Sequence, residues 1–160
     1  MKYLWAFGIA VVLAMPALGQ SDGQSAPTAP EVDEQSHRPV HFTYWLWVGT
    51  EVNETFNLSL TVPPHTSMFK CMKLAARRDS HYEFTKVDFS FGHYIDSIGG
   101  YHEQKDNSIF WMLYRLPSPP DRNNKPDDSA LTPKGVDGVF PRNGDHILFW
   151  YKEVDLSTHQ

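Results

Sequence analysis

Residues Thr55–Val62 alternate strictly between polar and apolar side chains. A repeat of two residues places Phe56, Leu58, Leu60 and Val62 on one face of a strand, so the run predicts a half-buried β-strand. The preceding run, His41–Val48, is rich in aromatic residues and also favours a strand. Gly49-Thr50-Glu51 between the two runs is the expected turn, and the folded part of the chain therefore starts with a β-hairpin.

A helix is expected after the hairpin. Thr66 or Ser67 can cap a helix that runs to about Arg78, where Asp79-Ser80 breaks it. Apolar side chains recur at i, i+3, i+4 and i+7 and predict one buried stripe, made of Met68, Cys71, Met72 and Ala75. The opposite face carries basic residues that we expect to be solvated: Lys70, Lys73, Arg77 and Arg78.

Strand-like composition returns after Tyr82. The expected strands are a run near Lys86–Phe91, then His93–Ile98, Ser108–Arg115 and the closing His146–Lys152. The proline-rich segment Leu116–Lys134 reads as a loop, and Pro141–Asp145 as a turn. At least five strands and one helix, with no internal repeat, predict an α+β domain.

The first 38 residues have a different composition. Residues 1–20 have the pattern of a cleavable signal peptide. A basic residue, Lys2, is followed by an apolar run from Tyr3 to Met15 and then by small residues at Ala17 and Gly19. The apolar run is shorter than the ~20 residues of a spanning helix. Residues 21–38 contain few large apolar side chains and predict a flexible leader. The folded domain is expected over residues 39–157, and the protein is expected to be secreted, with no membrane span.

Charge and cysteine usage narrow the classes of partner. The chain has 14 Lys and Arg against 19 Asp and Glu, a net charge of −5, without a basic stripe for phosphates. Nucleic acid is therefore not an expected partner. Cys71 is the only cysteine. Its place in the apolar stripe predicts a buried free thiol, with an intermolecular disulfide as the alternative.

No constellation of residues in the sequence points to catalysis. The eight histidines show none of the short metal-binding spacings, although strands could bring His81, His93 and His146 together. In the sequence, Asp88 with His93 and Asp145 with His146 are indistinguishable from turn and capping residues. The prediction is a protein that is not an enzyme, without a metal site and with no required cofactor.

One strand is apolar on both faces. Phe110, Met112 and Tyr114 point to one side, and Trp111 and Leu113 to the other. The helix stripe can cover only one of these sets. The other set is either covered by the loop 117–134 or forms an exposed apolar strip that binds a ligand or partner.

Three segments together resemble the C-terminal β domain of the intrinsic factor/transcobalamin family of cobalamin carriers: Tyr94–Gly100, Phe110–Pro117 and Gly135–Ile147. The likeness extends back to the hairpin Phe42–Val62 and to the helix end Leu74–Arg78. It implies a β-grasp-like mixed sheet crossed by one helix. It also implies a role, because in those carriers cobalamin lies between a helical barrel and this β domain.

The resemblance implies specific ligand contacts. They map to the strand Phe110, Trp111, Met112, Leu113 and Tyr114, and to Val136, Val139 and Phe140 in the turn that follows. Met112 stands where the family has Gln, which removes a polar contact. No helical barrel is expected in a chain of this length, so a lone β domain would hold only one face of the ligand.

Two functions follow as alternatives. The first is a secreted binding module for cobalamin or a related corrinoid, acting with a partner. The second is an extracellular structural or interaction protein that keeps the fold without cobalamin and binds another protein. Two sequons, at Asn53 and Asn57, predict N-glycosylation if the chain is exported.

Overall fold

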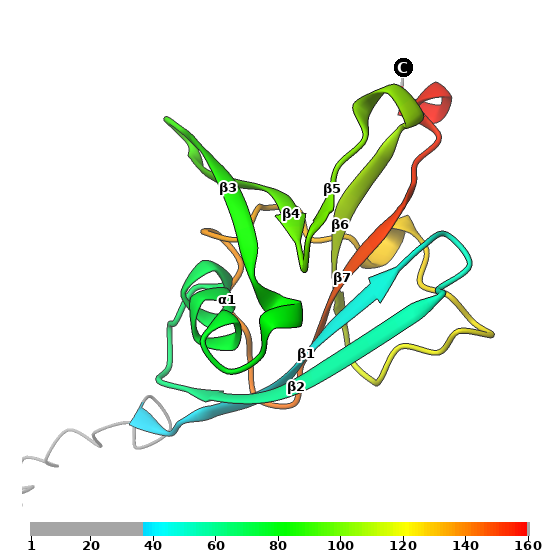
Figure 1. Ribbon diagram of the computed structural model, residues 1–160. Helices are drawn as coiled ribbons and strands as arrows, with labels where there is room; N and C mark the ends of the chain where they lie inside the picture. The colour runs from blue at the N-terminus through cyan, green and yellow to red at the C-terminus, as the bar shows by residue number, and fades with distance from the viewer. Residues whose placement is uncertain (1–36, 160) are drawn as a thin grey trace, which may run out of the picture. The chain divides into compact units, whose positions relative to one another are not determined.

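The computed structural model describes residues 37–159, so the predicted signal peptide and nearly all of the predicted leader lie outside the described residues. A four-stranded sheet has the order β2–β1–β7–β6. β1 (Val40–Val48) pairs antiparallel with β2 (Glu54–Val62) and parallel with β7 (His146–Glu153), which pairs antiparallel with β6 (Ile109–Leu116). The sheet is therefore mixed (Figure 1).

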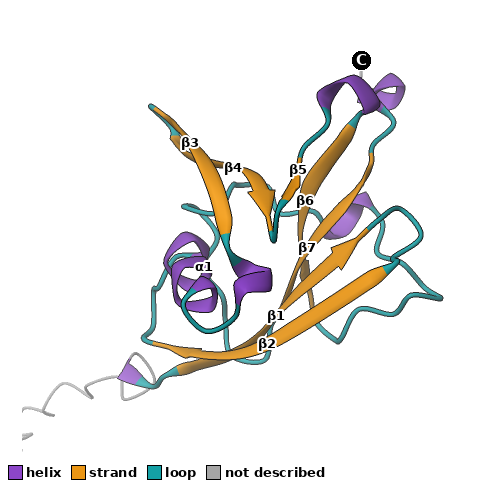
Figure 2. Cartoon of the chain, viewed as in Figure 1, coloured by secondary structure: helices purple, strands orange, loops and turns teal. Residues whose placement is uncertain are grey.

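A second, three-stranded sheet has the order β3–β4–β5. Its strands are β3 (Phe84–Phe89), β4 (Gly92–Ile98) and the short β5 (Tyr101–His102). Short 3₁₀ turns lie between the helix and strands at Ser80–Tyr82, Lys105–Asn107 and Asp128–Ala130 (Figure 2). The predicted α+β class, with a mixed sheet of strands crossed by one helix, is confirmed. The division of the strands into two sheets was not part of the prediction.

The helix α1 (Met68–Ala76) lies beside the β3–β4 hairpin, against one face of the four-stranded sheet (Figure 1). Ser67 is its N-cap and accepts from the backbone N–H of Lys70. The predicted stripe is confirmed, because Met68, Cys71, Met72 and Ala75 are all completely buried. The helix ends before the predicted Arg78. Asp79 instead accepts from the N–H of His81 and caps the following 3₁₀ turn.

The sheet has an apolar cluster on each face. On the face toward α1, alternate residues of β7 (Ile147, Phe149 and Tyr151) join the helix stripe in one large core. The intervening Leu148 and Trp150 enter a second cluster on the opposite face, together with Trp47 and Val52. β7 is buried on both faces, which explains its continuous apolar sequence.

Cys71 is a free, buried thiol, as predicted for the helix stripe. Burial raises the pKa of this thiol to about 12, so it is protonated at neutral pH and behaves as a small apolar side chain. No helix in the described range 37–159 is long and apolar enough to cross a membrane.

Candidate functional site

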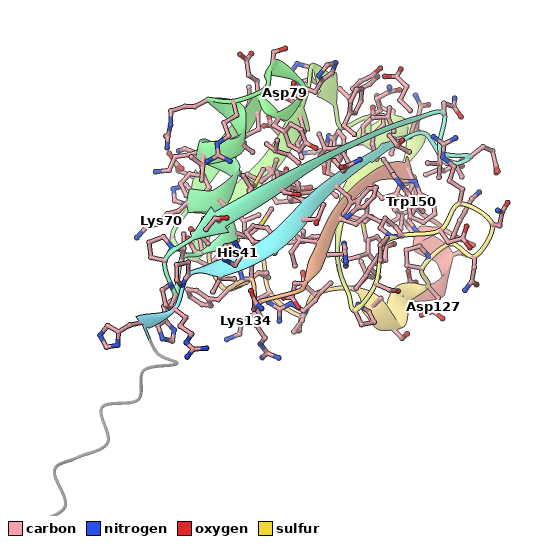
Figure 3. All side chains as sticks on the ribbon, turned by 90° about the horizontal axis from the view of Figure 1, so that it is seen from below. His41, Lys70, Asp79, Asp127, Lys134 and Trp150 are labelled. Carbon is pink, nitrogen blue, oxygen red and sulfur yellow. The ribbon has the colours of Figure 1, made fainter. Side chains whose placement is uncertain are left out.

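A groove of about 850 Å³ opens at one end of the four-stranded sheet. Three segments form its walls: the end of β6 at Arg115, the loop residues 129–134, and the turn residues 138–143. Val40 at the start of β1 and the residues Pro64 and His65 after β2 complete the lining. Figure 3 labels Lys134 of the groove lining at the lower edge of the molecule as seen from below, with Asp127 along the same edge.

The turn Val136–Phe140 is hydrogen-bonded to the start of α1. The backbone N–H groups of Met68 and Phe69 donate to the carbonyl oxygens of Val139 (2.7 Å) and Val136 (3.0 Å). These N–H groups belong to the first turn of α1, where no intrahelical acceptor exists. Val136 and Val139 are buried in the core, whereas Phe140 is 45% exposed at the rim of the groove.

The Lys, Arg, Asp and Glu residues in the groove lining are all basic. They are Arg115, Lys134 and Arg142. Arg115 is fixed by two contacts: its Nε lies 3.2 Å from Oδ2 of Asp145, and its Nη2 donates to the carbonyl oxygen of Phe140 at 2.7 Å. The groove thus combines an apolar turn with cationic groups that suit carbonyl, carboxylate or phosphate oxygens.

The structure brings only part of the predicted ligand site to this groove. Val139 and Phe140 line it, whereas Val136 is buried and not in its lining. Phe110, Trp111, Met112, Leu113 and Tyr114 are not in its lining. Arg115, one residue beyond the predicted strand segment, is a lining residue that the sequence analysis missed.

Of the two alternatives for β6, the exposed apolar strip is wrong. Trp111 and Leu113 pack in the core that α1 covers. On the other face, Tyr114 is completely buried under the loop, where it forms a β-bridge with Leu131. The N–H of Thr132 also donates to the carbonyl oxygen of Leu113 at 2.9 Å. The alternative, coverage by the loop 117–134, holds for Tyr114, whereas Phe110 and Met112 on the same face are half-buried.

The open apolar surface lies instead on the β3–β4 hairpin. Val87, Phe89, Phe91 and Tyr94 are 42%, 48%, 81% and 38% exposed. We call these four residues the hairpin face. The rings of Phe89 and Phe91 stack with centroids 5.0 Å apart, and Tyr94 packs edge-on to Phe89. The sequence signal was present in the alternation of Val87 and Phe89 with charged residues, but alternation does not say which face is covered.

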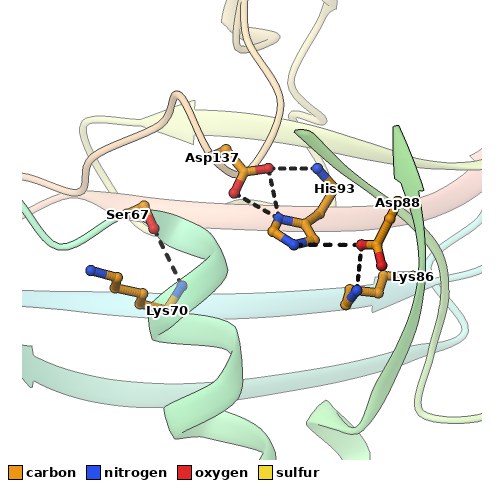
Figure 4. Close-up of polar contacts among 6 residues, drawn as sticks. All are labelled: Ser67, Lys70, Lys86, Asp88, His93 and Asp137. Atoms are coloured by element: carbon orange, nitrogen blue, oxygen red, sulfur yellow. Dashed lines mark hydrogen bonds and ion pairs between the residues drawn. The ribbon is translucent and has the colours of Figure 1, made fainter. Parts of the chain in front are cut away.

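A polar network occupies the opposite side of the same hairpin (Figure 4). The ring Nδ1 of His93 lies 2.8 Å from Oδ1 of Asp137, and the His93 backbone N–H donates to Oδ2 of Asp137 at 2.7 Å. The ring Nε2 of His93 lies 3.5 Å from Oδ1 of Asp88, and Asp88 also forms an ion pair with Lys86. The His93 ring stacks on Phe69 of α1, with centroids 3.8 Å apart. These contacts fasten the hairpin to α1 and to the turn 135–138.

Two features of this network have simple physical causes. Burial alone would raise the pKa of Asp137, but the hydrogen bonds from His93 outweigh it and hold the pKa below its usual value. A Cβ at Gly92, where φ is +132°, would lie 2.7 Å from Oδ2 of Asp137. Glycine therefore allows the carboxylate to approach the hairpin closely.

The histidines named in the sequence analysis lie in different surroundings. His81 stacks on Phe56, His93 pairs with Asp137, and Nδ1 of His146 accepts from the indole N–H of Trp45. Among residues 37–159, no group of three His, Cys, Asp or Glu side chains could hold a metal ion. Asp145 pairs with Arg115 rather than with His146. Asn53 and Asn57 are both exposed, so the two sequons are accessible.

Comparisons with known proteins find a similar sequence and a solved structure with a similar fold. No family model matches the chain. An uncharacterized protein of Drosophila melanogaster, CG3556, is 40% identical over 122 residues, which are 76% of this chain and 20% of that protein. The chain thus spans about a fifth of the length of this curated relative. The crystal structure of haptocorrin in complex with Cbi superposes with a TM-score of 0.60 at 18% identity, over 74% of this chain and 26% of haptocorrin. The latter likeness concerns the fold alone.

Proposed function

We propose that this chain is a non-enzymatic binding module that holds a small ligand of the corrinoid class in the groove beside the turn Val136–Phe140. The observation that carries the proposal is the groove itself. It has the volume of a ligand site and is built on the turn that the resemblance to cobalamin carriers implicates. The fold that the chain shares with haptocorrin, a protein solved with Cbi, supports the choice of ligand class.

The groove offers complementary chemistry to such a ligand. Phe140 presents an exposed apolar ring to the macrocycle, while Arg142 and Lys134 provide donors for the amide oxygens at its edge. Arg115 is already paired with Asp145 and with the Phe140 carbonyl, so its part is to position the turn. The buried residues Trp111, Leu113 and Tyr114 support the wall of the groove through the bonds of Leu113 and Tyr114 to the loop.

The groove is open, so it would enclose only one side of a bulky ligand. The chain matches a fifth of its Drosophila relative, and a further domain or a separate partner chain would cover the other side. We therefore expect weak binding by this domain alone, because a ligand half in water buries little of its surface.

The test is a titration of the purified chain with cobalamin and with cobinamide, followed by tryptophan fluorescence and by the corrinoid's visible absorption. Phe140→Ala and Arg142→Ala should each weaken binding about tenfold, equivalent to about 1.4 kcal/mol. Leu156→Ala is the matched control, because Leu156 is 54% exposed but lies outside the groove. If neither corrinoid binds the wild-type chain, or if Phe140→Ala binds as well as wild type, the interaction-protein alternative is favoured.

We propose further that the chain is exported and glycosylated. The signal-peptide pattern over residues 1–20 supports export. The exposure of the sequon residues Asn53 and Asn57 on the first hairpin supports glycosylation. Mass spectrometry of secreted material should give an N-terminus near Ala17–Ser21 and a mass loss on enzymatic removal of N-glycans. An intact Met1 on the secreted protein would contradict the prediction of cleavage.

A further inference from the structure

The strand β3 forms the outer edge of the three-stranded sheet. It pairs with β4 on one side, and the described residues place no strand on its other side (Figure 1). All of its residues except the half-buried Phe84 are exposed. An exposed edge strand presents unpaired backbone N–H and C=O groups to any second strand of matching sequence.

The charged side chains of β3 are arranged unusually for an edge strand that has no partner. Charges at an edge normally oppose pairing, because like charges meet across the new interface. Here the two charges have opposite sign and flank an apolar residue symmetrically, in the order Lys86-Val87-Asp88. This short motif is complementary to itself in the antiparallel direction.

We propose that two copies of this chain associate through β3, paired antiparallel about Val87, to form a continuous six-stranded sheet. In that register Lys86 of each copy lies opposite Asp88 of the other, and the two Val87 side chains meet at the twofold axis. Phe89 lies opposite Thr85 of the second copy and diagonal to its Val87, a distance that an aromatic side chain spans. The association therefore pairs both charges and covers part of the hairpin face.

Within one chain, the side chains of β3 already lie on the faces that this pairing requires. Lys86 and Asp88 contact each other within the strand and lie on the same side as His93, while Val87 and Phe89 point to the hairpin face. The network of His93 with Asp137 and Phe69 fastens the hairpin to the body of the domain, so the edge is presented in a fixed position. The groove is built from other segments, so this inference is independent of the proposed ligand.

The test measures the mass of the purified full chain by sedimentation over a wide range of concentrations. Wild type should show a monomer–dimer equilibrium. Lys86→Asp places like charges opposite each other at two symmetric positions and should weaken the dimer at least about tenfold. The double variant Lys86→Asp/Asp88→Lys restores opposite charges in the same register and should recover most of this loss. Lys70→Asp makes the same charge change on the exposed face of α1 and should leave the dimer unchanged.

A second measurement tests the register by cross-linking. Val87→Cys should form a disulfide-linked dimer under mild oxidation, because directly opposed residues of an antiparallel pair lie within disulfide distance. Phe89→Cys, on the same face but opposite Thr85, should not cross-link, and the native Cys71 is buried and does not interfere. A wild-type chain that stays monomeric at all concentrations, a double variant as weak as Lys86→Asp, or equal cross-linking at positions 87 and 89 would overturn the proposal.

Discussion

The strand β6 and the β3–β4 hairpin are both rich in aromatic residues, and their environments are opposite. β6 is apolar at six consecutive positions, 109–114, and Trp111, Leu113 and Tyr114 among them are buried. From Lys86 on, β3 alternates charged and apolar residues, yet the apolar Val87 and Phe89 face outward and the charges lie on the side of α1. The repeat of apolar residues along a strand shows which side chains share a face. Which of the two faces is buried depends on loops and helices elsewhere in the chain.

The largest expected difference between the two regions is in stability. Trp111→Ala removes a buried indole whose Nε1 donates to the carbonyl oxygen of Tyr101 at 2.8 Å. The change should lower the free energy of unfolding by about 3–5 kcal/mol, as for other buried aromatic residues replaced by alanine. Urea denaturation followed by circular dichroism measures this. A loss below about 1 kcal/mol would mean that β6 is exposed after all.

The next largest effect concerns the contact that fastens the hairpin to the body. Asp137→Ala leaves the backbone N–H and the ring Nδ1 of His93 without their carboxylate partner. Because both side chains are partly exposed, we expect a loss of about 1–2 kcal/mol. Hydrogen exchange of the β3–β4 amides should accelerate more than that of β6. Asp106→Asn, at an exposed aspartate in a 3₁₀ turn, is the control and should change neither quantity.

The same contact predicts a pH dependence. Hydrogen bonds from His93 hold the pKa of Asp137 below that of the unfolded chain, so its contribution is complete above about pH 4. The contribution is lost as the pH falls through the lower, folded-state pKa. Acid should therefore destabilise the wild-type chain more than Asp137→Ala. Parallel acid titration curves for the two proteins would contradict this assignment.

A smaller effect on the free energy of unfolding tests how the loop 117–134 packs over Tyr114 of β6. The hydroxyl of Tyr114 is buried without a hydrogen-bond partner among the described residues, whereas that of Tyr151 donates to the carbonyl oxygen of His102. Tyr114→Phe should raise the free energy of unfolding by about 0.5–1 kcal/mol, and the matched Tyr151→Phe should lower it by about 1 kcal/mol. Equal losses in the two variants would show that the loop 117–134 supplies a partner to Tyr114.

The sequence predicted the elements of this domain better than their surroundings. The period-two pattern of Thr55–Val62 and the stripe of Met68, Cys71, Met72 and Ala75 are local properties, and both predictions are confirmed. The groove depends on contacts between residues distant in the chain, such as Arg115 with Asp145 and Tyr114 with Leu131. No local pattern specifies such contacts. For the same reason the pairing of His93 with Asp137, 44 residues apart, was not anticipated, although His93 and Asp88 were considered together.

The smallest expected effect is at the tip of the hairpin, and it defines the comparison most sharply. Phe91 is 81% exposed, and its only ring contact among the described residues is the stack on Phe89. Phe91→Ala removes a side chain as large as many core residues, but this side chain is almost as hydrated in the folded chain as in the unfolded one. The free energy of unfolding should therefore change by less than about 0.5 kcal/mol, in the same urea assay that detects Trp111→Ala. A loss of several kcal/mol would require that another part of the chain or a second copy covers Phe91, and sedimentation of the variant would separate these two explanations. Because the β3 pairing is centred on Val87 rather than on Phe91, the variant should keep the dimer while it reduces the apolar surface of the hairpin face.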